Sequence, residues 1–385
     1  HARRSHCGPA LRLSFCITNI DGRNAMMKIK SLPLFCLLLA FSSAYSAPRS
    51  FNPPKDDPPV YSKNPEANAL YIQGLDYLSK GKPWAGGTVE NAKTALKLFR
   101  QAAQKDPKFA LAYVGQAEAL DGASFSVSGS TSPVKVFREQ EADAIKAIKL
   151  DESLPQAHQM LAEIYCDNEY DWPNAEKELK RLIELSPNSS AAHTRYGLFL
   201  GTVGRFEEAE AQLNLAKTMA PNSPAPYQTM MQVLYWQHKD DAAVEQGVKA
   251  VSLDKGLSSH FFLGFVYIHQ GQLQKGVEEM KLAAAGGDAG SLAALAYAYA
   301  MAGDKVEMQK AMDRFNQHPA HDHVYYGLAQ VYVALGDKDR AMNLIEKDYA
   351  QRSSRLKRAK FDATLDPLRQ DPRFKQLMHK MHFDQ

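Results

Sequence analysis

One spacing recurs along the chain with a period of 34 residues. Pro187 and Pro221 lie 34 positions apart, and the unit that ends at Pro221 carries Gly197, Ala209 and Ala216 at positions that recur in other units. A fixed period of this length is typical of stacked helix pairs in which each unit contacts only its neighbours. The period therefore predicts an extended array, with a surface that binds a partner along its length.

Eight helix pairs are expected within residues 68–351. In each pair the first helix carries a small residue in its middle (Met231 in the fifth pair), followed three positions later by an aromatic residue or leucine, and the second carries apolar residues spaced four and three apart. These spacings place the residues on one helical face, and in several units a proline then ends the second helix. The positions expected to hold the stack include Gly74, Ala95, Gly197, Ala209, Ala216, Pro221 and Gly264.

This pattern resembles the tetratricopeptide repeat over about three quarters of the chain. The sequence LDPLRQDPRFKQLM at residues 365–378 is similar to the C-terminal cap of bacterial arrays that are often attached to winged-helix regulators, cyclases or kinases. We expect no such effector domain here. The resemblance implies an all-α, right-handed superhelical solenoid of antiparallel helix pairs, with about eight repeats and a capping segment at residues 352–385.

Several positions depart from the repeat. Extra residues at 82–91 and 123–133 predict loops inside the first two pairs. Gly247 and Gly276 stand where second helices usually carry larger residues, which predicts looser packing there. Asp348 occupies the last small position of the eighth pair, so this pair fits the pattern least well.

The N-terminal part is read as a targeting region. Residues 1–25 look like sequence upstream of the native start, and residues 26–47 have the basic start, apolar run of about ten residues and small-residue end of a secretory signal peptide. Residues 48–67 are rich in proline, which favours an extended linker. We expect export to the periplasm or the cell exterior after signal cleavage. The alternative is an uncleaved signal that anchors the protein to a membrane.

Charge and cysteine content exclude two classes of function. The net charge is +3, but residues 1–47 hold six basic residues and one acidic residue, which leaves the remainder close to neutral. Nucleic-acid binding needs clustered Lys and Arg and is not expected. Cys166 is the only cysteine after the leader, so the mature chain has no internal disulfide or cysteine metal site. We expect a buried, unreactive thiol.

An aromatic stripe is the candidate binding site. In this family the first helix of each pair lines the concave side, and residues beside the packing stripe face the groove. Exposed aromatic side chains there suit a peptide or an amphipathic helix, although aromatic residues at helical spacing also pack between repeats. Groove positions on pairs four to six carry no Lys or Arg, so an acidic peptide tail is not the expected partner. The candidate residues are Gln232, Tyr235, Trp236, Phe261, Phe262, Phe265, Tyr297 and Tyr326.

Two other features are weighed as alternatives. The sequence HPAHDH at residues 318–323 contains transition-metal ligands, so a metal-dependent enzyme is one alternative, and a sensor module derived from a regulator is another. A basic run at Arg352, Arg355, Lys357, Arg358 and Lys360 reads as a solvated helix face. We predict a non-catalytic interaction scaffold of the cell envelope, with a protein or peptide partner and neither cofactor nor metal.

Overall fold

The computed structural model describes residues 60–80, 88–124, 133–254, 256–318 and 324–383, all of which belong to one compact unit. Within these ranges the chain is helical, with short 3₁₀ and π turns and no strand. The expected leader, signal and most of the proline-rich linker lie outside the described residues, as do most residues of both expected loops.

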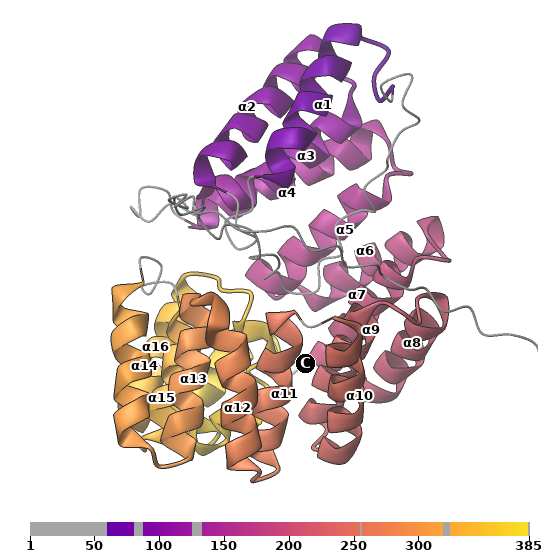
Figure 1. Cartoon of the computed structure of the whole chain (residues 1–385). Helices are drawn as coiled ribbons and strands as arrows, with labels where there is room; N and C mark the ends of the chain where they lie inside the picture. The colour runs from indigo at the N-terminus through magenta and orange to yellow at the C-terminus, as the bar shows by residue number, and fades with distance from the viewer. Residues whose placement is uncertain (1–59, 81–87, 125–132, 255, 319–323, 384–385) are drawn as a thin grey trace, which may run out of the picture. The chain divides into compact units, whose positions relative to one another are not determined.

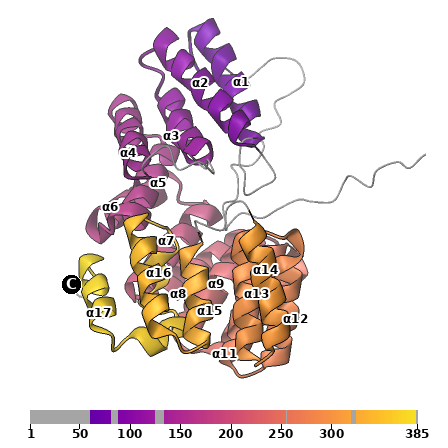
Figure 2. The same ribbon diagram turned by 90° about the vertical axis from the view of Figure 1, so that its left-hand side faces the viewer.

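Sixteen of the described helices form eight consecutive pairs, which confirms the expected all-α repeat architecture (Figures 1 and 2). A π turn, η2 (Tyr165–Glu169), extends α5, and 3₁₀ turns η5 (Leu356–Arg358) and η6 (Ala363–Leu368) lead from the last pair to α17 (Pro372–Lys380). The pairs are α1 (Pro65–Ser79) with α2 (Val89–Lys105), α3 (Ala110–Ser124) with α4 (Pro133–Leu150), α5 (Pro155–Ile164) with α6 (Trp172–Leu185), α7 (Ser190–Val203) with α8 (Phe206–Met219), α9 (Pro224–Trp236) with α10 (Asp240–Leu253), α11 (Leu257–His269) with α12 (Leu273–Ala283), α13 (Ala289–Met301) with α14 (Lys305–Gln317), and α15 (Tyr325–Ala334) with α16 (Lys338–Ala350).

Small residues let the two helices of a pair approach closely. A Cβ atom added at Gly74 would lie 2.6 Å from the ring of Phe99, and one added at Gly197 would lie 2.7 Å from Leu213. At Gly264 the nearest atom would be Met280 Cγ, at 2.9 Å. These distances are too short for a side chain without local movement, so the glycines set the separation of the helices.

The prediction of looser packing at Gly247 and Gly276 is wrong. A Cβ atom at Gly247 would lie 2.5 Å from Met231 Sδ and 2.8 Å from Leu263 Cδ1. At Gly276, Ile268 and the backbone of α11 take up the space. The larger side chains sit on the facing first helices instead, so helix separation is reduced without leaving a void.

A repeated hydrogen bond that the sequence analysis missed fixes the turn between consecutive pairs. An aromatic or imidazole side chain on the first helix bonds the carbonyl oxygen six residues earlier, at Tyr113, His158, His193 and Tyr227, with distances of 3.4, 3.0, 3.0 and 3.3 Å. The acceptor belongs to the turn that enters the helix. Each of these bonds satisfies a backbone carbonyl at the junction of two pairs.

We expect Ala216→Leu to destabilise the array by roughly 1–3 kcal/mol, because added methylenes in a filled core force displacement of neighbours. Ala216 is fully buried on α8, and its carbonyl accepts the Ser190 hydroxyl at 2.9 Å. Urea unfolding followed by circular dichroism measures the change. Leu215→Ala is the matched control, since Leu215 is 46% exposed on the same helix and should change stability by less than about 0.5 kcal/mol. An unchanged midpoint for Ala216→Leu would contradict the assigned register.

Candidate binding groove

The structure brings five of the eight candidate groove residues together around one small cavity. Gln232, Tyr235 and Trp236 come from α9, and Phe262 and Phe265 from α11. The cavity has about 20 Å³ of space for the centre of a water molecule, which is room for about one water. Residues from later in the chain close it, namely Gln330, Arg358 and Asp362.

Two of the remaining candidates lie beside the cavity residues through ring contacts, and the third through a hydrogen bond to a carboxylate that lines the cavity. Phe261 lies 5.2 Å from Phe265, centroid to centroid, and Phe265 lies 5.5 Å from Tyr297. The Tyr326 hydroxyl donates to Asp362 Oδ2 at 2.7 Å. Five of the eight side chains are buried, and three are half-buried: Gln232, Phe261 and Phe262. Their role in partner binding stays a prediction, and only these three retain substantial accessible surface.

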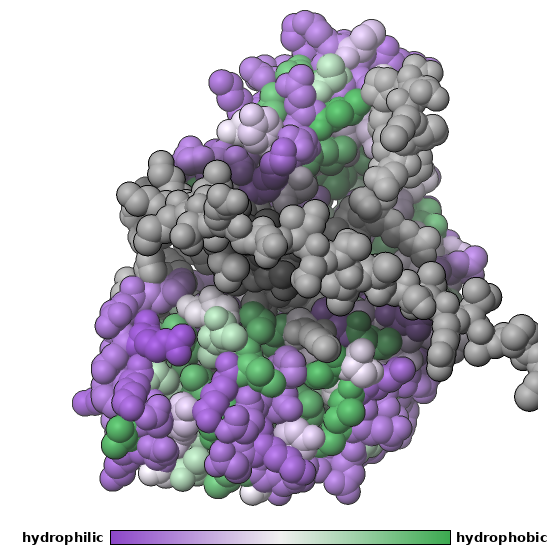
Figure 3. All heavy atoms as spheres, viewed as in Figure 1, coloured by the Kyte–Doolittle hydropathy of each residue, from purple (hydrophilic) through white to green (hydrophobic). Residues whose placement is uncertain are grey.

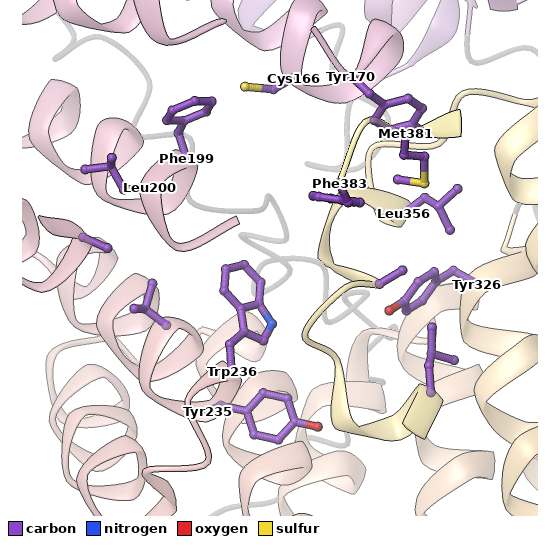
Figure 4. Packing of buried hydrophobic residues seen from close by; sticks show 14 of the residues in the cluster. Cys166, Tyr170, Phe199, Leu200, Tyr235, Trp236, Tyr326, Leu356, Met381 and Phe383 are labelled. Carbon is purple, nitrogen blue, oxygen red and sulfur yellow. The ribbon is translucent and has the colours of Figure 1, made fainter. Parts of the chain in front are cut away.

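The groove is covered because residues 352–383, the C-terminal segment, fold back onto it. Eight of the segment's side chains are buried in the same hydrophobic cluster as Trp172, Phe199 and Trp236. Figure 4 shows Leu356, Met381 and Phe383 on the segment's side of this cluster, with Tyr235 and Trp236 opposite. The segment is thus more than an end cap on the eighth pair, since it also contacts the third, fourth and fifth pairs.

Polar contacts tie the segment to the end of α5 and the start of α6. Asn168 Nδ2 donates to the Arg352 carbonyl at 3.2 Å, and Arg352 Nη1 donates to the Asn168 carbonyl at 3.0 Å. Trp172 Nε1 donates to the Met381 carbonyl at 2.9 Å, while its ring stacks on Phe383 at 4.9 Å. Together with the contact of His382 Nδ1 with the Tyr170 carbonyl oxygen, these bonds join residues 184 to 212 positions apart, and we call this set of contacts the latch.

The prediction that the basic run is a solvated helix face is wrong for Lys357 and Arg358, which are half-buried in the 3₁₀ turn η5, while Arg355 is exposed. Lys357 pairs with Asp167, and Arg358 lies 4.7 Å from the ring centroid of Tyr326. Burial is the largest single effect and would lower the pKa of Lys357, but Asp167, Cys166 and Glu163 together outweigh it and hold the pKa above its usual value. The cations that the groove helices lack are therefore supplied by the C-terminal segment.

Left-handed backbone is concentrated at the latch. Among the described residues, four other than glycine have positive φ, and three of them meet here: Tyr170, Arg352 and His382, at 54°, 54° and 57°. The Arg352 guanidinium lies over the Tyr170 ring at 6.0 Å, and His382 Nδ1 lies 3.2 Å from the Tyr170 carbonyl oxygen. Each of the three follows the end of a helix, so the latch is built from the turns that end η2, α16 and α17.

The π turn η2 places the left-handed residue of the third pair one position later than in the fourth pair. In the fourth pair, the left-handed residue Gly204 follows the small residue Gly197 by seven positions. In the third pair the corresponding spacing, from Ala162 to Tyr170, is eight. The π turn accommodates the extra residue, and π turns are frequent at functional sites. This one-residue difference is the signal by which the sequence could have identified the latch.

Unsatisfied polar atoms gather at the same contact. Six buried side-chain nitrogen or oxygen atoms of the described residues lack a hydrogen-bond partner, and three of them are Tyr170 Oη, Asp348 Oδ2 and Arg358 Nε. Burial raises the pKa of Asp348 to about 6, although Arg355 and Arg358 lower it. Burial also raises the pKa of the Tyr170 hydroxyl far above its usual value. Buried polar groups without partners are costly, so the contact is less favourable than its area suggests.

The other candidate chemical sites receive no support from this geometry. Cys166 is a free, buried thiol, as expected, and burial raises its pKa far above the usual range. Within the described part of the chain, no three His, Cys, Asp or Glu side chains are placed to hold a metal ion. His318 ends α14, but His321, Asp322 and His323 lie outside the described residues, so the metal alternative stays a hypothesis.

The outer surface carries scattered hydrophobic residues. On the face shown in Figure 3, hydrophobic residues over α9–α14 are interspersed among hydrophilic ones. Exposed examples on the second helices are Leu215, Val248, Leu282 and Val306. Single exposed apolar side chains are ordinary on soluble surfaces. None of the described helices combines the length and apolar character needed to cross a bilayer.

Comparisons with known proteins agree with the fold. A family model described as the tetratricopeptide repeat matches residues 322–347, which hold α15 and most of α16. This is the pair in which Asp348 departs from the pattern. Yeast Tom70 has a similar structure, with a TM-score of 0.54 and 17% sequence identity over 83% of this chain and 68% of Tom70.

Two bacterial structures are similar over a smaller part of this chain. PilF of Pseudomonas aeruginosa is 19% identical, with a TM-score of 0.42 over 56% of this chain and 93% of its own. A tetratricopeptide-repeat protein of Thermus thermophilus, TTC0263, is 16% identical, with a TM-score of 0.43 over 52% of this chain and 99% of its own. None of the curated proteins matches this sequence.

Proposed function

Because this chain is a tetratricopeptide-repeat protein, we propose that it is a non-catalytic scaffold of the cell envelope that holds a polypeptide segment on its inner face. Repeat arrays of this kind present extended surfaces to partners. The observation that carries the proposal is the half-buried aromatic pair Phe261 and Phe262, beside a groove lined by buried rings. Aromatic side chains next to a preformed apolar groove are typical anchoring points for a peptide.

The chemistry of the groove supports binding over catalysis. Burial raises the pKa values of Tyr235 and Tyr326 well above the usual range, so both hydroxyls stay neutral. Asp362 is engaged by Tyr326 and Gln330, at 2.7 and 3.3 Å. The groove therefore offers rings and a carboxylate that is already hydrogen-bonded, which suit recognition of a peptide.

Replacing both Phe261 and Phe262 with Ser should weaken peptide binding at least about ten-fold, because the double change removes the accessible aromatic area. Fluorescence polarisation with a panel of labelled peptides, varied in charge and aromatic content, measures the affinity. Phe265 is left intact because it is only 6% exposed and supports the fold. Val248→Ser is the matched control, since Val248 is 51% exposed on α10. Equal affinities for the double variant and the parent, with circular dichroism unchanged, would contradict the proposed site.

Export is the second part of the proposal, and the sequence of residues 26–47 supports it. Residues 1–67 fused to a reporter enzyme that is active only outside the cytoplasm should give activity in a bacterial host. Replacing two leucines of the apolar run, Leu37 and Leu38, with Arg should abolish this activity, because charges are incompatible with a signal-peptide core. Mass spectrometry of the exported fusion distinguishes cleavage from anchoring. Cytoplasmic retention of the parent fusion would contradict the envelope assignment.

A further inference from the structure

The C-terminal segment occupies the surface at which an external polypeptide is proposed to bind. We propose that residues 352–383 are a displaceable internal ligand of the groove, and that the external ligand is a polypeptide segment of the same chemistry, cationic with aromatic side chains. This inference rests on the proposed function, because it names the partner class and the regulation of that same groove.

The chemistry of the contact defines the partner class. The array supplies carboxylates on the third pair, where Asp167 pairs with Lys357. It also supplies aromatic rings: Phe206 meets Phe361 edge-on at 5.1 Å, and Trp172 stacks on Phe383 at 4.9 Å. The segment thus presents one cation and two rings to complementary groups at the turn within the third pair and at the start of α8 in the fourth.

Glycine at the fourth pair makes room for one of these rings. A Cβ atom at Gly204 would lie 2.9 Å from Phe361 Cζ, so only glycine leaves space for the ring in this position. Gly204 also has a φ of 88°, which side chains rarely adopt. A competing segment would need an aromatic residue at this point and a cation near Asp167.

Buried polar atoms without partners point to displacement rather than to permanent packing. Three of the six unsatisfied buried polar atoms of the described residues lie at or beside the segment. Water can reach these atoms when the contact opens, which lowers the free-energy difference between the closed and open states.

The connectivity of the segment also permits release. The segment folds as the short turns η5 and η6 and the nine-residue helix α17. Its hydrogen bonds with the third pair that involve a backbone carbonyl each use one side chain, from Asn168, Trp172, Arg352 or His382. No helix of the repeat array continues into it, because α16 ends at Ala350. Opening would therefore leave the eight helix pairs intact.

The test uses the full-length chain and the charge reversal Lys357→Glu, which sets like charges against Asp167. Hydrogen exchange followed by mass spectrometry should show faster exchange at residues 356–383, by at least ten-fold, with exchange in α7–α10 unchanged. A fluorescein-labelled peptide with the sequence of residues 352–385 should bind this variant at least ten-fold more tightly than the parent chain, because apparent affinity scales with the fraction of chains in which the groove is open.

Lys357→Gln should give the same changes to a smaller extent, and it replaces Lys357→Glu in the test if the charge reversal impairs folding. Lys375→Glu is the matched control, since Lys375 is exposed on α17 and bonds only Gln370 at 2.9 Å.

Two results would overturn the inference. If residues 356–383 of the parent and both Lys357 variants exchange only together with α7–α10, the segment is a permanent part of the fold. If the segment opens but the labelled peptide binds no variant more tightly than Lys375→Glu, the groove does not select this chemistry. Neither result decides the proposed function, which depends on the peptide panel and the Phe261 and Phe262 variants.

Discussion

Phe99→Ala is expected to lower the free energy of unfolding of the first two helix pairs by about 4 kcal/mol. Phe99 is fully buried, and its ring lies between two glycines: added Cβ atoms would approach it to 2.6 Å from Gly74 and 2.8 Å from Gly115. Neither glycine has a side chain that could move into the cavity left by the ring. Little relaxation is possible, so the cost should lie in the upper part of the range for such substitutions.

The loss should stay local to the first two pairs. Their core, which includes Tyr71, Phe99 and Phe109, forms a cluster separate from that of the later pairs. Among the described residues, a small cluster of Val114, Ala147 and Ala157, with partly buried neighbours, lies between the second pair and the third. In repeat arrays, stability is close to a sum of unit and interface contributions, so units with separate cores can unfold separately.

Native-state hydrogen exchange provides the measurement for Phe99→Ala. Protection should fall in α1–α3 and remain in α7–α10. The control is Tyr77→Ala on α1, where the side chain is 38% exposed and the change should stay within about 0.5 kcal/mol. A uniform loss of protection along the whole chain would show that the array unfolds as one cooperative unit.

The helix pairs could be predicted because their determinants are local. Gly197 and Leu213 are 16 positions apart, and their contact recurs at Gly264 and Met280 with the same spacing. A repeated spacing of this kind encodes both the helices and their facing sides. Even the eighth pair, in which Asp348 breaks the pattern, keeps enough of the spacing to fold as the others do.

The covering of the groove could not be predicted, because its determinants are not local. Trp172 and Met381 are 209 positions apart, and no periodicity relates them. The candidate rings lie on first helices, mainly α9 and α11, but the exposure of Trp236 depends on where the C-terminal segment lies. A stripe of aromatic residues has the same sequence pattern whether a partner or the chain itself covers it. The basic run was misread for this reason, since Lys357 finds its carboxylate on the third pair.

Asp348 should make the stability of the fold fall as the pH rises through about 6. The side chain is 1% exposed, and burial raises its pKa from 3.8 to about 6 against the opposing effects of Arg355, Ser353, the Tyr326 backbone and Arg358. A carboxyl group with a higher pKa in the folded state binds its proton more tightly there. Its contribution to stability is therefore fully present below the unfolded pKa and is lost as the pH rises through the folded value.

The size of this effect follows from the two pKa values. One pKa unit corresponds to about 1.4 kcal/mol, so the full contribution is about 3 kcal/mol, of which about half appears between pH 8 and pH 5. Asp348→Asn removes this titration while keeping the shape of the side chain. The difference in unfolding free energy between the parent and Asp348→Asn, from urea unfolding at each pH, should shift by about 1.4 kcal/mol in favour of the parent from pH 8 to pH 5.

Taking the difference between the two proteins isolates Asp348 from other titrating groups. Burial also raises the pKa of Asp143 to about 7, and Asp143 is present in both proteins, so its contribution cancels. A difference that stays constant from pH 8 to pH 5 would mean that Asp348 titrates as an ordinary solvated carboxyl group. In that case water reaches Oδ2, and the contact between α16 and the C-terminal segment is more open than its burial indicates.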